Sequence, residues 1–237
     1  MAQVALHPSL ARPARDFAPI MLALVSAGHT VHLVEPGRGA TVHDLAGAVE
    51  RTLDAAGVAR AHVVGHAFGN RVMRCFAADH PERVASVSLF GAGGLVPGAP
   101  AATAALGRLL WDQGNRAEVL EALRVAMFAP GASIPDDWVD GWDPDLARVQ
   151  HEASSVTPVG DWWTAGTAVP VLVVQGLDDR IAPPENGRAL VAEIGARARL
   201  VEFDAMGHAM LPERPADLAA VLLAFLAEVD PDVATAP

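Results

Sequence analysis

The sequence contains no lysine and no tyrosine, and Cys75 is its single cysteine. Without lysine the chain has no Schiff-base nucleophile and no phosphate-loop lysine, and without tyrosine it has no phenolic acid or base. A single cysteine excludes an internal disulfide and a metal site built from several cysteines. The chemistry of this protein must therefore come from other residue types.

Positive charge is also scarce. The 17 arginines stand against 28 acidic residues, a formal net charge of −11 without any basic stripe, so we expect no nucleic-acid partner and no membrane binding. The sequence has no uninterrupted apolar run of about 18 residues and no apolar core of a signal peptide, which predicts a cytoplasmic protein. Hydrophobic residues are 51% of the chain, which excludes disorder.

Short β-branched runs alternate with longer helical patterns along most of the 237 residues, which predicts an α/β fold with a mostly parallel central sheet flanked by helices. Strands are predicted at residues 3–7, 31–35, 61–65, 84–90, 171–176 and 200–203. Helices are predicted at residues 14–27, 42–56, 70–79, 185–194 and 216–229. Thr41, with Asp44 three residues later, is the expected cap of the second helix.

The alternation stops between residues 95 and 168, where two or three helices are predicted after the fourth strand. This segment holds all five tryptophans and ten acidic residues against four arginines. We interpret it as a helical lid on a core formed by residues 1–94 and 169–237. Trp138, Trp142 and Trp162 are expected to line a pocket for a small apolar substrate, and the acidic excess disfavours an anionic one.

The most informative segment is 63–70, which reads Val-Val-Gly-His-Ala-Phe-Gly-Asn. Gly65 and Gly69 flank Ala67 at i−2 and i+2, between a predicted strand and a predicted helix. Two glycines at this spacing permit a very sharp turn, as in the G-x-S-x-G nucleophile elbow, except that alanine occupies the apex. The side chain of His66 should point away from this site and have a structural role.

Four further motifs occur in the order expected of one fold: His7-Pro8-Ser9-Leu10, Glu35-Pro36-Gly37-Arg38-Gly39, Gly176-Leu177-Asp178-Asp179-Arg180 and Ala205-Met206-Gly207-His208-Ala209. With these motifs the chain resembles the α/β-hydrolase superfamily, in its serine-hydrolase type with a helical lid, over nearly its whole length. The resemblance implies an α/β-hydrolase fold in which residues 3–7 correspond to the third strand of the usual sheet.

The resemblance also implies roles for individual residues. His208 would be the general base, and Asp179 fits the position of the acid better than Asp178, which remains an alternative. The backbone N–H groups of Ser9 and Phe68 would form the oxyanion hole. Neither a cofactor nor a metal ion is implied.

Ala67 departs from the family pattern, because a methyl group cannot attack a carbonyl carbon. Ala67 is either a natural residue or the replacement of a serine, and the sequence leaves both explanations open. We expect a hydrolase of small apolar carboxylic esters or lactones that lacks its nucleophile. The alternatives are a general-base enzyme using His208 and Asp179 for proton abstraction, carbon–carbon cleavage or cofactor-free oxygenation, and a ligand-binding protein without activity. The sequence is equally compatible with a monomer and a homodimer.

Overall fold

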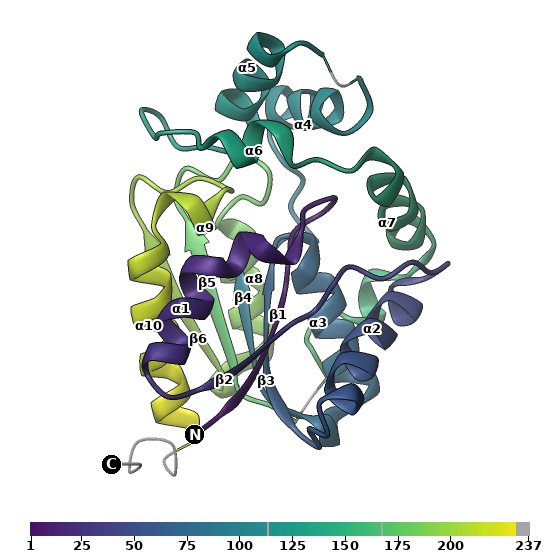
Figure 1. The fold of residues 1–237 in the computed structure, drawn as a ribbon, viewed down its shortest axis with the longest axis vertical. Helices are drawn as coiled ribbons and strands as arrows, with labels where there is room; N and C mark the ends of the chain where they lie inside the picture. Colours follow the sequence, from purple (N-terminus) through teal and green to yellow (C-terminus); the bar gives the residue numbers. More distant parts are fainter. Residues whose placement is uncertain (113, 167, 231–237) are drawn as a thin grey trace.

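The computed structural model describes residues 1–112, 114–166 and 168–230, and a six-stranded sheet forms its centre (Figure 1). The strand order is β2-β1-β3-β4-β5-β6, and every neighbouring pair is parallel. The strands are β1 (Gln3–His7), β2 (Thr30–Leu33), β3 (Ala61–His66), β4 (Val84–Phe90), β5 (Val171–Gly176) and β6 (Ala198–Phe203). The predicted α/β fold with a parallel sheet is confirmed, and three of the predicted strands have the observed bounds.

Helices cover both faces of the sheet, which explains the apolar character of its inner strands. Every residue of β3 and β5 is buried, whereas the edge strand β2 is half-buried along its length. Along β1, Val4 and Leu6 pack on one face and Ala5 on the other. The first face is covered by α1 (Ala18–Ser26) and α10 (Pro215–Val229). The second is covered by α2 (Val42–Ala55), α3 (Phe68–Asp79) and α8 (Glu185–Ile194).

The predicted helices are present with small shifts at their ends. The predicted capping of α2 is confirmed. The Thr41 side chain accepts from the Asp44 backbone N–H, and the Asp44 carboxylate accepts from the Thr41 backbone N–H. The helix predicted at residues 14–27 is divided into a 3-10 turn, Ala14–Phe17, followed by α1. Helix α3 begins at Phe68, two residues earlier than predicted, because the chain reverses direction within the single residue Ala67.

The segment between β4 and β5 contains α4 (Pro100–Gly107), α5 (Arg116–Ala126), α6 (Asp136–Asp140) and α7 (Pro144–Val156). The prediction of two or three helices is therefore too low, since α6 is too short to give a periodic pattern. These helices lie beyond the carboxyl ends of the strands (Figure 1). The loop after β1, drawn in purple, lies on the same side of the sheet.

None of the helices in the described ranges has both the length and the apolar character needed to cross a bilayer.

Candidate active site

Ala67 occupies the apex of a sharp turn between β3 and α3. Its backbone angles, φ 51° and ψ −111°, are ones that residues other than glycine rarely adopt. Its backbone N–H donates to the carbonyl oxygen of Phe90 at 2.9 Å. A Cβ atom at Gly65 would lie 2.5 Å from the carbonyl group of Gly69, and one at Gly69 would lie 2.4 Å from the carbonyl oxygen of His7. Both flanking glycines are therefore required by backbone contacts.

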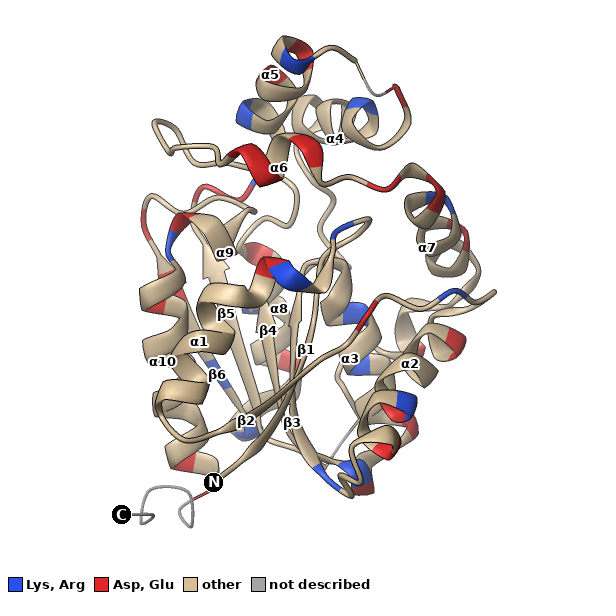
Figure 2. Cartoon of the chain, viewed as in Figure 1, with Lys and Arg blue, Asp and Glu red and all other residues tan. Residues whose placement is uncertain are grey.

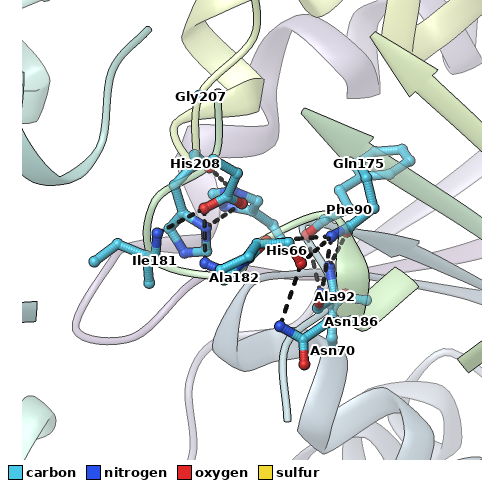
Figure 3. Close-up of polar contacts among 12 residues, drawn as sticks. His66, Asn70, Phe90, Ala92, Gln175, Ile181, Ala182, Asn186, Gly207 and His208 are labelled. Carbon is cyan, nitrogen blue, oxygen red and sulfur yellow. Dashed lines mark hydrogen bonds and ion pairs between the residues drawn. The ribbon is translucent and has the colours of Figure 1, made fainter. Parts of the chain in front are cut away.

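Asp179 and His208 form a buried pair beside this turn. Asp179 Oδ2 lies 2.7 Å from His208 Nδ1, and the two residues are 3% and 5% exposed. The other carboxylate oxygen of Asp179 accepts from the backbone N–H groups of Ile181 (2.9 Å) and Ala182 (2.7 Å), which Figure 3 shows next to His208. The backbone N–H of Asp178 instead donates to Met206. The structure thus brings Asp179, and not its neighbour, to the histidine.

Two further side chains fix the loop that carries His208. His66 Nε2 donates to the backbone carbonyl of His208 at 2.8 Å, and the two rings are 5.7 Å apart. Burial lowers the pKa of His66 to about 3, so this ring is neutral and adds no charge beside His208. Glu213 Oε2 accepts from the backbone N–H groups of Gly207 (3.0 Å) and Ala129 (3.2 Å). His66 therefore supports the loop without lining the cavity described below.

The backbone N–H groups of Ser9 and Phe68 are both available beside Ala67. Phe68 is the first residue of α3, so its N–H has no partner within the helix. In the described part of the chain no acceptor contacts the N–H of Ser9, which follows Pro8 in the loop after β1. Both residues line the same cavity as Ala67 and His208. Two N–H groups in this position could polarise a bound carbonyl group.

A cavity of about 620 Å³ lies between the carboxyl end of the sheet and the helices between β4 and β5. It is lined from the sheet side by Ala67 and His208, and from the helical segment by Leu106, Trp111 and Trp142, among others. Its volume suits a small organic molecule.

Only one of the three tryptophans expected at this cavity, Trp142, lines it. Trp138 instead packs against the guanidinium of Arg12 at 4.5 Å, and Trp162 against that of Arg74 at the same distance. Both rings are nearly fully buried. Each aromatic face attracts the guanidinium that lies over it, so these two tryptophans stabilise arginines instead of lining the cavity. Trp111, which the sequence did not single out, lines the cavity and is 44% exposed.

Sequence analysis also missed two buried amides that connect the loops around the site. Gln175 Oε1 accepts from the N–H of Ala92 at 2.6 Å, and its Nε2 donates to the carbonyl of Ala182 at 3.2 Å. Asn186 Oδ1 accepts from the N–H of Val96 at 2.7 Å. Figure 3 shows both amides among the loop carbonyls. Gln175 could have been noticed as the only polar side chain in an otherwise apolar strand.

One group of potential metal ligands lies away from the cavity. The ligand atoms of His43, Cys75 and Asp79 lie within 4.8 Å of one another. Hydrogen bonds already join them, with 2.8 Å between His43 Nδ1 and Asp79 Oδ2 and 3.2 Å between Cys75 Sγ and His43 Nδ1. Burial, followed by the charge of Asp79, raises the pKa of the Cys75 thiol. The thiol is therefore neutral in this network.

Comparison with known proteins gives one family. Residues 4–221 match the alpha/beta hydrolase family. The chain is 31% identical over 209 residues to a 2-hydroxy-6-oxononadienedioate/2-hydroxy-6-oxononatrienedioate hydrolase of Cupriavidus pinatubonensis, covering 78% of this chain and 72% of that relative. It is 29% identical over 175 residues to the 2-hydroxy-6-oxo-6-phenylhexa-2,4-dienoate hydrolase of Comamonas testosteroni, covering 68% of this chain and only 60% of that relative's own length.

A solved structure, Rv0554 from Mycobacterium tuberculosis, has the same fold, with a TM-score of 0.79 at 21% identity over 97% of this chain and 91% of that chain. The fold is thus that of the α/β hydrolases. The chain belongs to the alpha/beta hydrolase family, and the relatives above carry the names of hydrolases.

Proposed function

We propose that this chain carries the site of a Ser-His-Asp hydrolase for small apolar carboxylic esters or lactones, in a form that lacks the nucleophile. The observation that carries the proposal is the 2.7 Å contact between Asp179 and His208 beside a nucleophile elbow whose apex is Ala67. In this assignment His208 is the general base, and Asp179 fixes the tautomer and orientation of its ring. The N–H groups of Ser9 and Phe68 bind the carbonyl oxygen.

With serine at position 67, the hydroxyl oxygen would attack the carbonyl carbon while His208 Nε2 accepts the hydroxyl proton. The carbonyl electron pair would move onto the oxygen held by the two N–H groups, and His208 would then protonate the departing alkoxide. Water would hydrolyse the acyl-enzyme by the same route in reverse. Ala67 has no atom for the first step, and removal of the nucleophile costs roughly a million-fold in turnover in such enzymes.

The helices between β4 and β5 would cover the site in this proposal. Residues 95–168 would act as a lid, with residues 1–94 and 169–237 as the hydrolase core. The cavity lies between these two parts, and both contribute to its lining. A lid of this kind excludes water from the reacting carbonyl, which strengthens the hydrogen bonds that stabilise the oxyanion.

A second candidate needs no nucleophile. The contact of Nδ1 with Asp179 leaves Nε2 of His208 as the basic atom available to a ligand in the cavity. His208 could therefore deprotonate bound water or an acidic C–H group of the substrate directly. In a third candidate, the cavity binds a ligand without catalysis.

A paired measurement separates these candidates. The chain with Ala67 and its Ala67→Ser variant would be exposed to a fluorophosphonate probe and to a panel of chromogenic esters and lactones. We expect labelling and turnover from the serine variant alone. Ala205→Ser is the matched control, because Ala205 also has a positive φ (52°) but is exposed and outside the cavity lining.

Each other result favours a different candidate. If neither form reacts, the hydrolase proposal is wrong, and direct binding measurements would then test the ligand-binding candidate. Turnover by the Ala67 form that is abolished by His208→Ala would identify the general-base candidate.

A further inference from the structure

The charged side chains that line the cavity differ in sign from the net charge of the protein. The chain has a formal net charge of −11, yet among the described residues no aspartate or glutamate lines the cavity. Arg71 is the one arginine among the described residues of that lining. Figure 2 shows acidic positions on α6 and α7, in the helical segment, but these side chains do not line the cavity. Composition disfavoured an anionic substrate, but that argument counts acidic side chains that do not line the cavity.

Arg71 has no acidic partner in the described ranges. No carboxylate oxygen lies within 4.0 Å of its guanidinium, which rests over the rings of Trp162 (5.4 Å) and Phe68 (5.9 Å). One nitrogen donates to the hydroxyl of Ser154 on α7. Burial lowers the pKa of Arg71, which reflects the cost of holding this charge partly out of water. Arginine remains protonated at neutral pH, so an anion that entered the cavity would offset this cost.

The neighbouring Arg74 differs from Arg71 in a way that separates a structural arginine from a ligand-binding one. All three nitrogens of Arg74 donate to backbone carbonyls, those of Asn70, Trp163 and Gly93. Arg71 makes a single hydrogen bond to the described residues, although a guanidinium has five N–H donors. Within the described ranges none of its nitrogens is fully buried without a partner, and Arg71 belongs to the lining of the cavity.

We propose that Arg71 binds a carboxylate of the substrate, at a subsite separate from the reacting carbonyl group. The hydroxyl groups of Ser154 and Ser155, which line the same cavity, would complete this subsite. A single guanidinium neutralises one carboxylate and matches its planar pair of oxygens, whereas a phosphate dianion would retain charge. The substrate class is therefore an ester or lactone that carries a free carboxylate, such as the half-ester of a dicarboxylic acid, in place of the wholly apolar substrate of the proposed function.

This inference rests on the proposed function for the position of the reacting carbonyl. Arg71 is four residues beyond Ala67, on the first turns of α3, and both line the cavity. One molecule can thus reach the elbow with its carbonyl group and Arg71 with its carboxylate. The remote charge would supply binding energy that positions the carbonyl for attack.

The first experiment measures selectivity in the Ala67→Ser background. Its substrates are the monoethyl esters of succinic, glutaric and adipic acids, each paired with the neutral amide that replaces the free carboxylate. We expect a higher kcat/KM for at least one half-ester than for its amide. Arg71→Met should reduce this ratio about 10- to 100-fold, the range for charge-assisted hydrogen bonds, while Arg71→Lys should retain part of it.

Arg148→Met is the matched control, because Arg148 lies on α7 with a side chain that is 59% exposed and outside the cavity lining. It should leave the ratio unchanged. Equal kcat/KM for every half-ester and its amide would overturn the inference without depending on any Arg71 variant. A ratio that survives Arg71→Met would overturn it as well.

A second experiment separates failure of the inference from failure of the proposed function. Calorimetry on the chain with Ala67 measures the Kd of the same half-esters and amides without turnover. If Ala67→Ser is inactive but the half-esters bind more tightly in an Arg71-dependent way, the subsite stands and the hydrolase proposal fails. If Ala67→Ser hydrolyses the ester bond of the neutral amide analogues as well as that of the half-esters, the hydrolase proposal stands and the carboxylate subsite fails.

Discussion

Gly69 and His7 are in backbone contact, because a Cβ atom at Gly69 would lie 2.4 Å from the His7 carbonyl oxygen and 2.6 Å from that of Pro8. This contact joins the elbow to the loop that carries Ser9. The two proposed oxyanion donors, on different elements, are thus held in one relative position by a glycine.

Gly69→Ala is therefore expected to destabilise the protein by about 1–3 kcal/mol, the usual cost of overpacking, since the atoms it meets are backbone and cannot rotate away. Urea denaturation measures the free energy of unfolding. Gly160→Ala is the control, because a Cβ at Gly160 meets no atom within 4 Å. Equal stability of the two variants would contradict the close contact.

Asp179→Asn in the Ala67→Ser background should reduce kcat by roughly ten-thousand-fold, the effect of losing the carboxylate that orients a catalytic histidine. Asp178→Asn provides the control, since only the backbone of Asp178 is tied to the loop, through its bond to Met206. Ester hydrolysis under saturating substrate measures both variants. A larger loss in Asp178→Asn would reverse the assignment of the acid.

The protein should lose stability on acidification because two buried histidines resist protonation. Burial lowers the pKa of His66 to about 3 and that of His7 to about 4, from the usual 6.5. Below pH 6.5 the unfolded chain binds protons that the folded chain does not, so stability falls as the pH falls towards 4 and then 3. At pH 5 each histidine should cost about 2 kcal/mol relative to neutral pH.

Unfolding free energies between pH 7.5 and 5 test this expectation, because they should fall by roughly 4 kcal/mol in total from these two residues. His66→Gln can retain a donor for the carbonyl of His208 but does not titrate, so its stability should depend less on pH. The same pH dependence in His66→Gln as in the parent chain would show that His66 is not one of the groups responsible.

Arg12 and Asp16, four residues apart in the segment after β1, form a buried ion pair. Arg12 Nε lies 2.7 Å from Asp16 Oδ2, and the side chains are 0% and 6% exposed. Arg12 also donates to the backbone carbonyl of Asp137 at 3.0 Å and packs against Trp142 at 5.0 Å. It thereby connects the core to one wall of the cavity.

Arg12→Met should destabilise the protein by about 3–5 kcal/mol, because it leaves the Asp16 carboxylate buried without a partner. Removing both charges in Arg12→Met with Asp16→Leu should recover a large part of this loss. Thermal and urea unfolding at neutral pH measure the three proteins. A double variant less stable than the single one would show that Asp16 is stabilised by other groups.

Local features were predictable from the sequence where neighbouring residues decide them. Gly65 and Gly69 indicated the turn around Ala67 because Gly65 meets the backbone of Gly69 only four positions away, whereas the contact of Gly69 with His7 appeared only in the structure. Apolar runs indicated β3 and β5 because both faces of these strands are buried. Thr41 and Asp44 indicated the start of α2 because capping is completed within one turn.

Contacts between distant residues required the tertiary structure. The resemblance favoured Asp179 but left Asp178 open, and only the contact with His208, 29 residues further along the chain, shows which carboxylate meets the histidine. Trp138 and Trp162 resembled pocket residues, but Arg12 and Arg74 cover their faces from elsewhere in the chain.

The sequence by itself determined the α/β fold, the order of its motifs and the missing hydroxyl at position 67, because these depend on composition, periodicity and one residue identity. Only the tertiary structure decided which charged side chains line the cavity. Composition sums the charges of residues 95–168, whereas folding directs the acidic side chains away from the cavity and leaves Arg71 in its wall. A ligand responds to the charges that face it, so the net charge of the protein does not predict what this site binds.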